Sequence, residues 1–202
     1  MKYILSLLIL VFASRGQSQS PLSNQELADF QIRARTRIEE LESYISTIAD
    51  KDLSFDERNQ AITNALKLFT RNATIQVSRT SNPSSIKNSD GPVSQPIPIA
   101  TYFQRLKNLP YSQVKVTNFN AARVDDWVLQ KDGSYQATGY YFQNFKAWRR
   151  INGRLIPVVN HLDKKKIDVD LRMRDDPEFK EKHWMVLFEN ISVSATGKAA
   201  AQ

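Results

Sequence analysis

The two histidines of the chain, His161 and His183, are the side chains best suited to transfer protons near neutral pH. An imidazole acts as a general base or acid most effectively when a carboxylate lies within hydrogen-bond reach. Asp126 is the carboxylate that we pair with either histidine, although no spacing argument brings them together. The alternative is that both histidines are ordinary residues of a sheet. These three residues are the candidate catalytic residues, and a tyrosine is the alternative partner for the aspartate.

Other kinds of catalytic chemistry have no support in the sequence. The histidines do not form an H-x-H or H-E-x-x-H motif, and the chain has no cysteine. We therefore predict no metal site and no cofactor. No G-x-S-x-G, Walker or G-x-G-x-x-G motif occurs, so nucleophilic and nucleotide-dependent reactions are unsupported.

Six aromatic residues fall on predicted strands and on a short predicted helix, where they would line one concave surface. They are Tyr102, Tyr111, Trp127, Tyr140, Phe142 and Trp148. An aromatic-lined concavity is typical of a small-molecule site. The alternative is that these rings simply form the core.

Basic residues are concentrated in the second half of the chain. The predicted patch consists of Arg149, Arg150, Lys164, Lys165, Lys166, Arg172 and Arg174. Such a patch could bind an anionic glycan, a lipid headgroup or an acidic protein. The alternative is that these charges protect exposed strands from aggregation. Nucleic-acid binding is disfavoured because acidic residues are interleaved and the net charge is only +7.

The elements that would position these residues begin with two helices. Each opens with a capping box, Ser23 to Glu26 and Ser54 to Glu57. The first helix should extend to about Ile48, and the second should end near residues 71–72. Strict alternation of apolar residues then predicts a strand over residues 73–79.

The rest of the chain should be mostly sheet. Residues 80–96 have the composition of a long loop, and a short helix should follow over residues 99–109. The predicted strands are 112–119, 122–130, 134–145, 166–174 and 183–193. Asp132-Gly133 and Asn152-Gly153 are hairpin signals, and Pro157 should interrupt strand pairing.

The N-terminus has the pattern of a secretory signal peptide over residues 1–19. Lys2 precedes an apolar run, and a small polar segment follows it. The apolar run is shorter than the roughly 20 residues that a membrane-spanning helix needs. We therefore predict an exported protein, periplasmic or extracellular, without a membrane span. Residues 20–195 should form one domain, and residues 196–202 should form a flexible tail.

This order of elements resembles the nuclear transport factor two-like superfamily, the cone-shaped α+β fold shared with scytalone dehydratase and ketosteroid isomerase. The resemblance is carried by the helix-to-strand junction at residues 66–77, by residues 101–103 and by the closing strand at residues 184–193. It covers roughly residues 24–195, and the chain is similar in particular to uncharacterised exported bacterial members. The resemblance implies an α+β fold with two to three N-terminal helices packed in the concavity of a curved antiparallel sheet of five to six strands.

In this superfamily the open end of the cone is a pocket, which some members use for catalysis and others for binding. Fold alone does not decide between them. Our prediction is an exported, non-catalytic binding or interaction module, with the aromatic-lined pocket and the basic strand face as its sites. Its ligand would be a small apolar or anionic molecule. The alternative is a lyase- or isomerase-like enzyme with a His–Asp or Tyr–Asp pair in the pocket. A homodimer through the outer sheet face is a third expectation.

Overall fold

The computed structural model describes residues 21–78, 95–175 and 181–197. The predicted signal peptide, residues 79–94 of the predicted loop and residues 198–202 of the predicted tail lie outside the described residues. Within the described ranges, no helix is both long and apolar enough to cross a membrane.

Three helices are present in the described residues: α1 (Asn24–Ala49), α2 (Phe55–Leu66) and α3 (Ile99–Lys107). Both predicted capping boxes are confirmed. The Ser23 backbone donates to the Glu26 carboxylate at 2.8 Å, and the Glu26 backbone donates to the Ser23 hydroxyl at 3.3 Å. Ser54 and Glu57 repeat the arrangement at the start of α2. These reciprocal bonds satisfy amides that the first helical turn leaves without a partner.

The sheet of the described residues has seven strands, in the order β2-β1-β7-β6-β5-β3 with β4 beside β5. The predicted fold class, α+β with helices against a curved sheet, is confirmed. One pairing differs from the antiparallel expectation, because β1 runs parallel to β7. Two of the seven strands have only two residues. The strands are β1 (Phe69–Ile75), β2 (Ile97–Pro98), β3 (Gln113–Val124), β4 (Val128–Leu129), β5 (Tyr135–Ile151), β6 (Arg154–Asp175) and β7 (Lys182–Gly197).

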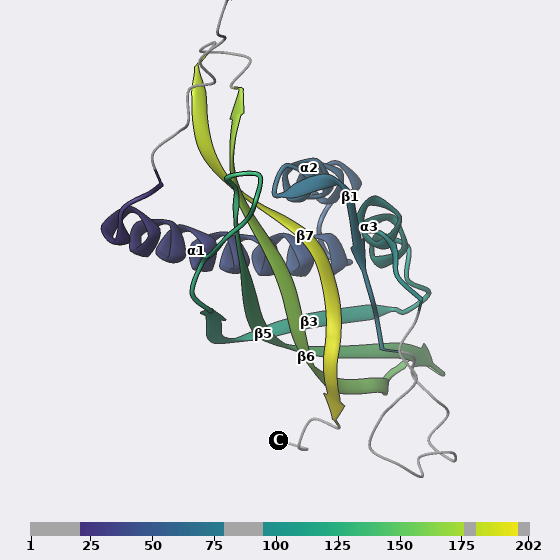
Figure 1. Ribbon diagram of the computed structural model, residues 1–202. Helices are drawn as coiled ribbons and strands as arrows, with labels where there is room; N and C mark the ends of the chain where they lie inside the picture. The colour runs from purple at the N-terminus through teal and green to yellow at the C-terminus, as the bar shows by residue number, and fades with distance from the viewer. Residues whose placement is uncertain (1–20, 79–94, 176–180, 198–202) are drawn as a thin grey trace, which may run out of the picture.

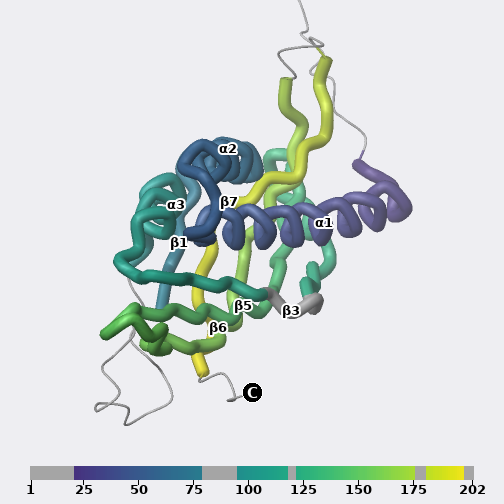
Figure 2. Tube along the Cα trace, turned by 180° about the vertical axis from the view of Figure 1, so that it is seen from behind, coloured from purple at the N-terminus to yellow at the C-terminus, as the bar shows by residue number. Residues whose placement is uncertain are grey.

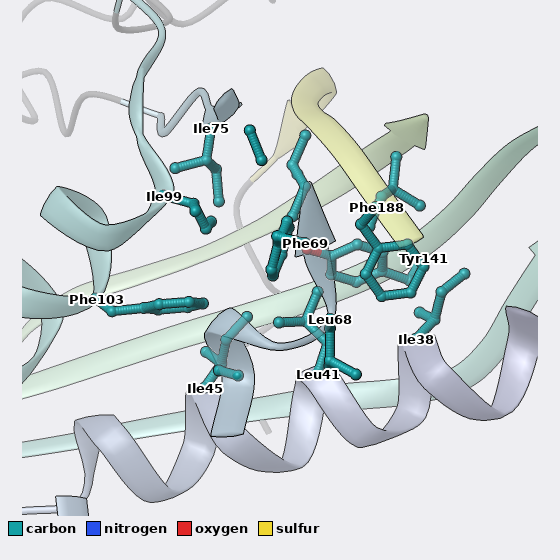
Figure 3. Close-up of a cluster of buried hydrophobic side chains, with 14 of the residues drawn as sticks. Ile38, Leu41, Ile45, Leu68, Phe69, Ile75, Ile99, Phe103, Tyr141 and Phe188 are labelled. Carbon is teal, nitrogen blue, oxygen red and sulfur yellow. The ribbon is translucent and has the colours of Figure 1, made fainter. Parts of the chain in front are cut away.

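The sheet is strongly bent, and the helices lie on its concave side. Figures 1 and 2 show β5 and β6 turning through the molecule while α1 crosses the sheet and α2 and α3 stand side by side. The buried stripe of α1 includes Ile38, Leu41 and Ile45. Figure 3 shows these side chains facing Leu68, Phe69 and Phe188 across the apolar core. Gly139 lets α1 approach closely, because a Cβ there would lie 2.8 Å from Ile38 Cδ1.

The junction between α2 and β1 lies earlier than the sequence predicts. The helix ends at Leu66, and Phe69, which fits the helical period, opens the strand. The Phe69 ring packs edge-on against Phe188 at 5.6 Å, and the Phe188 backbone donates to the Leu68 carbonyl at 2.8 Å. Pairing with β7 therefore overrides the local helical pattern.

The β5–β6 hairpin is longer than predicted. Asn152 and Gly153 both have positive φ, as a two-residue hairpin turn requires, so this turn signal is confirmed. Pro157 does not end the pairing. It lies opposite Trp148 at a register shift, where β6 has one extra residue. A bulge of this kind accommodates the proline within the ladder.

Two further register shifts give β7 an extra residue each, between its pairings with Ile167 and Val169 and between those with Lys164 and Lys165. Side chains alternate along a regular strand, so each extra residue changes which positions face inward. Phe188, Ile191 and Thr196 consequently share the inner face although their spacing is not regular. β7 extends to Gly197, so residues 196–197, which we assigned to the tail, belong to the strand.

Candidate functional site

The inner face of β6 carries three polar residues in consecutive inward positions: His161, Asp163 and Lys165. Ile167, Val169 and Leu171 continue the same face as apolar core. The Asp163 and Lys165 side chains are only 3% and 2% exposed, and Lys165 Nζ lies 2.9 Å from Asp163 Oδ2. A buried ion pair thus lies on the concave side of the sheet.

Asp163 is held from several directions. Its Oδ1 accepts hydrogen bonds from Ser78 Oγ at 2.7 Å and from Thr196 Oγ1 at 2.9 Å. Burial alone would raise its pKa, but the Lys165 charge and the hydrogen bonds from Ser78 and Lys165 hold the pKa below its usual value. The carboxylate is therefore ionised at neutral pH.

His161 lies at the edge of this ion pair. Its Nε2 is 3.8 Å from Asp163 Oδ2, and its ring stacks on Phe145 with the centroids 5.4 Å apart. Burial lowers the pKa of His161, the Asp163 charge raises it in part, and Lys165 lowers it. The imidazole is therefore neutral at neutral pH, with 20% of its side chain exposed.

Four further polar side chains surround these three. Burial raises the pKa of Tyr141, which lies on β5. The electrostatic effects of Tyr102, Glu42 and Asp163 raise it further. Figure 3 shows its ring reaching into the core beside Phe188. Gln143 is the direct cross-strand partner of Asp163. We call the set Glu42, Tyr102, Tyr141, Gln143, His161, Asp163 and Lys165 the interior polar cluster.

Several atoms of the interior polar cluster are buried without a hydrogen-bond partner among the described residues. They are Glu42 Oε1, Tyr141 OH, Gln143 Nε2 and His161 Nδ1. Buried polar groups are nearly always hydrogen-bonded, so such a group of unpartnered atoms needs an explanation. Bound water or a bound polar molecule would supply the missing partners. In the same described residues, no three His, Cys, Asp or Glu side chains are arranged to hold a metal ion.

No protein-family model and no curated protein matches the chain. Solved structures that resemble it include Kfla4162 from Kribbella flavida, with 15% identity and a TM-score of 0.40, covering 83% of this chain and 92% of that one. A protein assigned as a scytalone dehydratase from Novosphingobium aromaticivorans has 8% identity and a TM-score of 0.44, over 88% and 93% of the two chains. ActVI-ORFA from Streptomyces coelicolor has 11% identity and a TM-score of 0.36, over 81% and 96%.

The architecture is a cone-like α+β fold. This conclusion follows from the bent sheet and the helices on its concave side. Identities this low and TM-scores below 0.5 say nothing about activity, so the functional argument depends on the residues inside the cone.

The six predicted pocket aromatics do not form one surface. Tyr102 belongs to the interior polar cluster, and Tyr111 lies beside it, with its ring 6.5 Å from that of Phe145. Trp127 donates its indole N–H to the Leu27 carbonyl at 3.0 Å, which ties it to α1. The other three occupy even-numbered positions of β5, on the face opposite Tyr141 and Gln143: Tyr140, Phe142 and Trp148. Strand alternation thus divides the set.

The predicted catalytic residues are also separated. His183 pairs with Arg174, thirteen residues along β6 from His161, which corresponds to about 40 Å along the strand. Asp126 lies just after the end of β3, which pairs with the first part of β5. His161 pairs with Phe145, which lies further along β5. The carboxylate beside His161 is Asp163, not Asp126. The H-x-D-x-K spacing is present in the sequence, but the predicted strand begins at Lys166 and therefore does not include it.

The predicted basic patch divides into four places. Lys165 is buried inside the cone, whereas Lys164 and Lys166 are on the outer face, where Lys166 lies 3.5 Å from Asp168. Near the other end of β6, Arg172 and Arg174 lie 2.6 and 3.7 Å from the buried Asp170. Arg149 and Arg150 are near the β5–β6 turn, so the seven residues do not form one docking surface.

A separate hollow of about 310 Å³ lies between the turn before β5 and the ends of β6 and β7. Its lining residues are Asp132, Gly133, Ser134, Arg172, Met173, Lys182 and Trp184. Asp132 accepts from the Ser134 hydroxyl at 2.6 Å, and Arg172 makes two bonds to Asp170. Asp132 and Arg172, two of the three charged residues in this lining, therefore already have partners, and we favour the interior polar cluster as the functional site.

Proposed function

We propose that the interior polar cluster binds a small neutral molecule that carries hydroxyl and carbonyl groups. The unpartnered buried atoms carry this proposal. Gln143 Nε2 needs an acceptor, whereas Tyr141 OH and His161 Nδ1 can each donate or accept, so a ligand with carbonyl and hydroxyl oxygens can satisfy all three atoms. The Asp163–Lys165 pair has no net charge, and it therefore gives no preference for an ionic ligand.

The protein would act as an exported binding protein in this proposal. The signal-peptide pattern of residues 1–19 supports export. Self-association through the outer sheet face stays a prediction, to be checked by light scattering over a range of protein concentrations.

Ligand binding is expected to require Gln143. Native mass spectrometry of protein purified from its source should show a bound small molecule on the wild type and none on Gln143→Leu, which removes the amide donor. Once the molecule is identified, a free concentration of 100 times its Kd should stabilise the wild type by about 2.7 kcal/mol. Calorimetric thermal unfolding, with and without the molecule, measures this gain.

Gln136→Leu is the matched control, because Gln136 is an exposed residue of the same strand on the opposite face. This variant should retain the molecule as the wild type does. A wild-type protein that carries no molecule, and that gains no stability from a panel of hydroxy ketones and lactones, would contradict the proposal.

A second candidate function is proton transfer of the lyase or isomerase type. The observation that favours it is a neutral imidazole 3.8 Å from an ionised carboxylate. His161 would take a proton from a carbon next to the ligand carbonyl, and Asp163 would stabilise the resulting imidazolium. Tyr102 and Tyr141 would donate hydrogen bonds to the carbonyl oxygen, on which negative charge develops.

Proton transfer is expected to exchange that carbon-bound hydrogen for deuterium in heavy water, which proton NMR of the bound molecule detects. His161→Gln should lower the exchange rate by at least 100-fold, the lower end of what a general base contributes. His183→Gln, the control, changes the other histidine and should leave the rate unchanged. If a ligand binds but its carbon-bound hydrogen does not exchange for deuterium, the protein is a binding module and the proton-transfer function is contradicted.

A further inference from the structure

The end of the β5–β6 hairpin exposes an unusual amount of apolar side chain. Eight large hydrophobic residues are exposed in the described parts of the chain, and four of them lie here: Ile151 (47%), Leu155 (43%), Ile156 (41%) and Val158 (43%). We call residues 148–158 the hairpin tip. Contiguous exposed apolar side chains mark interaction sites more often than isolated ones do.

The same segment is strongly basic. Between Phe145 and Leu162 the sequence contains Lys146, Arg149, Arg150 and Arg154 and no acidic residue, a formal charge of +4. Several basic residues elsewhere on the sheet have acidic partners, such as Asp168 for Lys166. The hairpin tip therefore combines a local positive charge with exposed aliphatic groups.

Cross-strand pairing places the two kinds of side chain next to each other. Arg149 pairs with Ile156, Arg150 with Leu155, and Ile151 with Arg154, so both faces of the ribbon carry one guanidinium beside each aliphatic group. Figure 1 shows β5 ending in its arrowhead at the lower right, at the margin of the sheet. The tip lies beyond the core, whose last members on this hairpin are Ala147 and Val159.

We propose that the hairpin tip docks on the surface of an anionic phospholipid bilayer. Ile151, Leu155 and Ile156 enter the boundary between headgroups and acyl chains, and the arginines contact lipid phosphates while their stems cover apolar surface. Charge complementarity selects this occupant. An anionic bilayer carries the negative charge that complements the basic tip. Basic residues that lie close to such a surface are attracted to it.

A second copy of the chain fits the tip poorly. A two-fold contact between tips would place two segments of +3 against each other. Addition of a strand to the edge of β6 is hindered by Pro157, which has no amide hydrogen, and by the register shift beside it. The tip proposal is independent of the ligand proposed for the interior polar cluster.

Binding is tested by sedimentation of the full chain with vesicles of phosphatidylglycerol and phosphatidylcholine in equal amounts, compared with vesicles of phosphatidylcholine alone, at 0.1 M salt. The wild type should prefer the anionic vesicles. Changing Arg149, Arg150 and Arg154 together to alanine should weaken that binding roughly 100-fold, because each basic residue near an anionic surface contributes about a factor of five. Residues 1–19 are the same in every variant, so binding through them cannot produce a difference between the variants.

The control variant changes Arg35, Arg71 and Lys131 together to alanine. It loses the same charge from exposed positions on α1, on β1 and in the turn before β5. It should keep binding within about threefold of the wild type. Equal weakening by both triple variants, or equal binding of the wild type to both kinds of vesicle, would overturn the proposal.

A second measurement leaves the charge of the tip intact. The chain has no cysteine, so Leu155→Cys and Gln136→Cys each give one site for an environment-sensitive fluorophore. With anionic vesicles, the emission at position 155 should shift to the blue and that at position 136 should not. A blue shift at position 155 that depends on protein concentration, without vesicles, would instead identify a second copy as the occupant and overturn the proposal.

Discussion

Replacing Lys165 by methionine is expected to lower the free energy of unfolding by about 3–5 kcal/mol, because the Asp163 carboxylate would stay buried without its counter-charge. The two side chains are 2% and 3% exposed and lie 2.9 Å apart. Ser78 and Thr196 would still donate to Asp163, but hydroxyl donors do not neutralise a charge. Urea unfolding at pH 7 measures the change.

Lys166→Met is the matched control. Lys166 is the next residue of β6, faces outward with 42% of its side chain exposed, and lies 3.5 Å from an exposed carboxylate. An exposed pair of this kind contributes at most about 1 kcal/mol. Adding Asp163→Asn to Lys165→Met should recover part of the lost stability, since the double variant leaves no unpaired charge. Equal effects of the two single methionine variants would mean that Lys165 is not buried against Asp163.

The capping boxes and the turn signals made much of the fold predictable from sequence. Ser23 with Glu26 and Ser54 with Glu57 start helices through bonds within four residues, so local sequence specifies them. Asn152 and Gly153 take the positive φ that their residue types favour. The fold class could be predicted because such signals fix the order of helices and strands.

The candidate site was harder to predict, because it depends on which face each strand residue takes. The predicted basic patch includes Lys165 with Lys164 and Lys166, although strand alternation places Lys165 inward beside Asp163. Thr196 reaches Asp163 only because β7 carries two extra residues, and no feature of the sequence marks their positions. Pairing and bulges are set by tertiary contacts, which a single sequence does not display.

Replacing Glu42 by glutamine is expected to stabilise the protein by about 3 kcal/mol at pH 8. Burial, and less strongly Glu39, raises the pKa of Glu42 from 4.5 to about 7. Between these two values the folded chain binds more protons at this site than the unfolded chain does, so this carboxyl lowers stability as the pH rises through that window. Each pKa unit corresponds to about 1.4 kcal/mol. Glutamine has a similar shape and no charge, so it removes this penalty.

The measurement is the difference in unfolding free energy between Glu42→Gln and the wild type, followed in urea from pH 4.5 to pH 8. The difference should be close to zero at pH 4.5 and should reach its full size near pH 8. Glu39→Gln, an exposed change on the same helix, should give a much smaller difference, since repulsion by Glu39 is the lesser cause. A difference that does not vary with pH would mean that the Glu42 carboxylate has a partner or reaches water. Glu42 would then no longer belong among the unpartnered atoms that support ligand binding inside the cone.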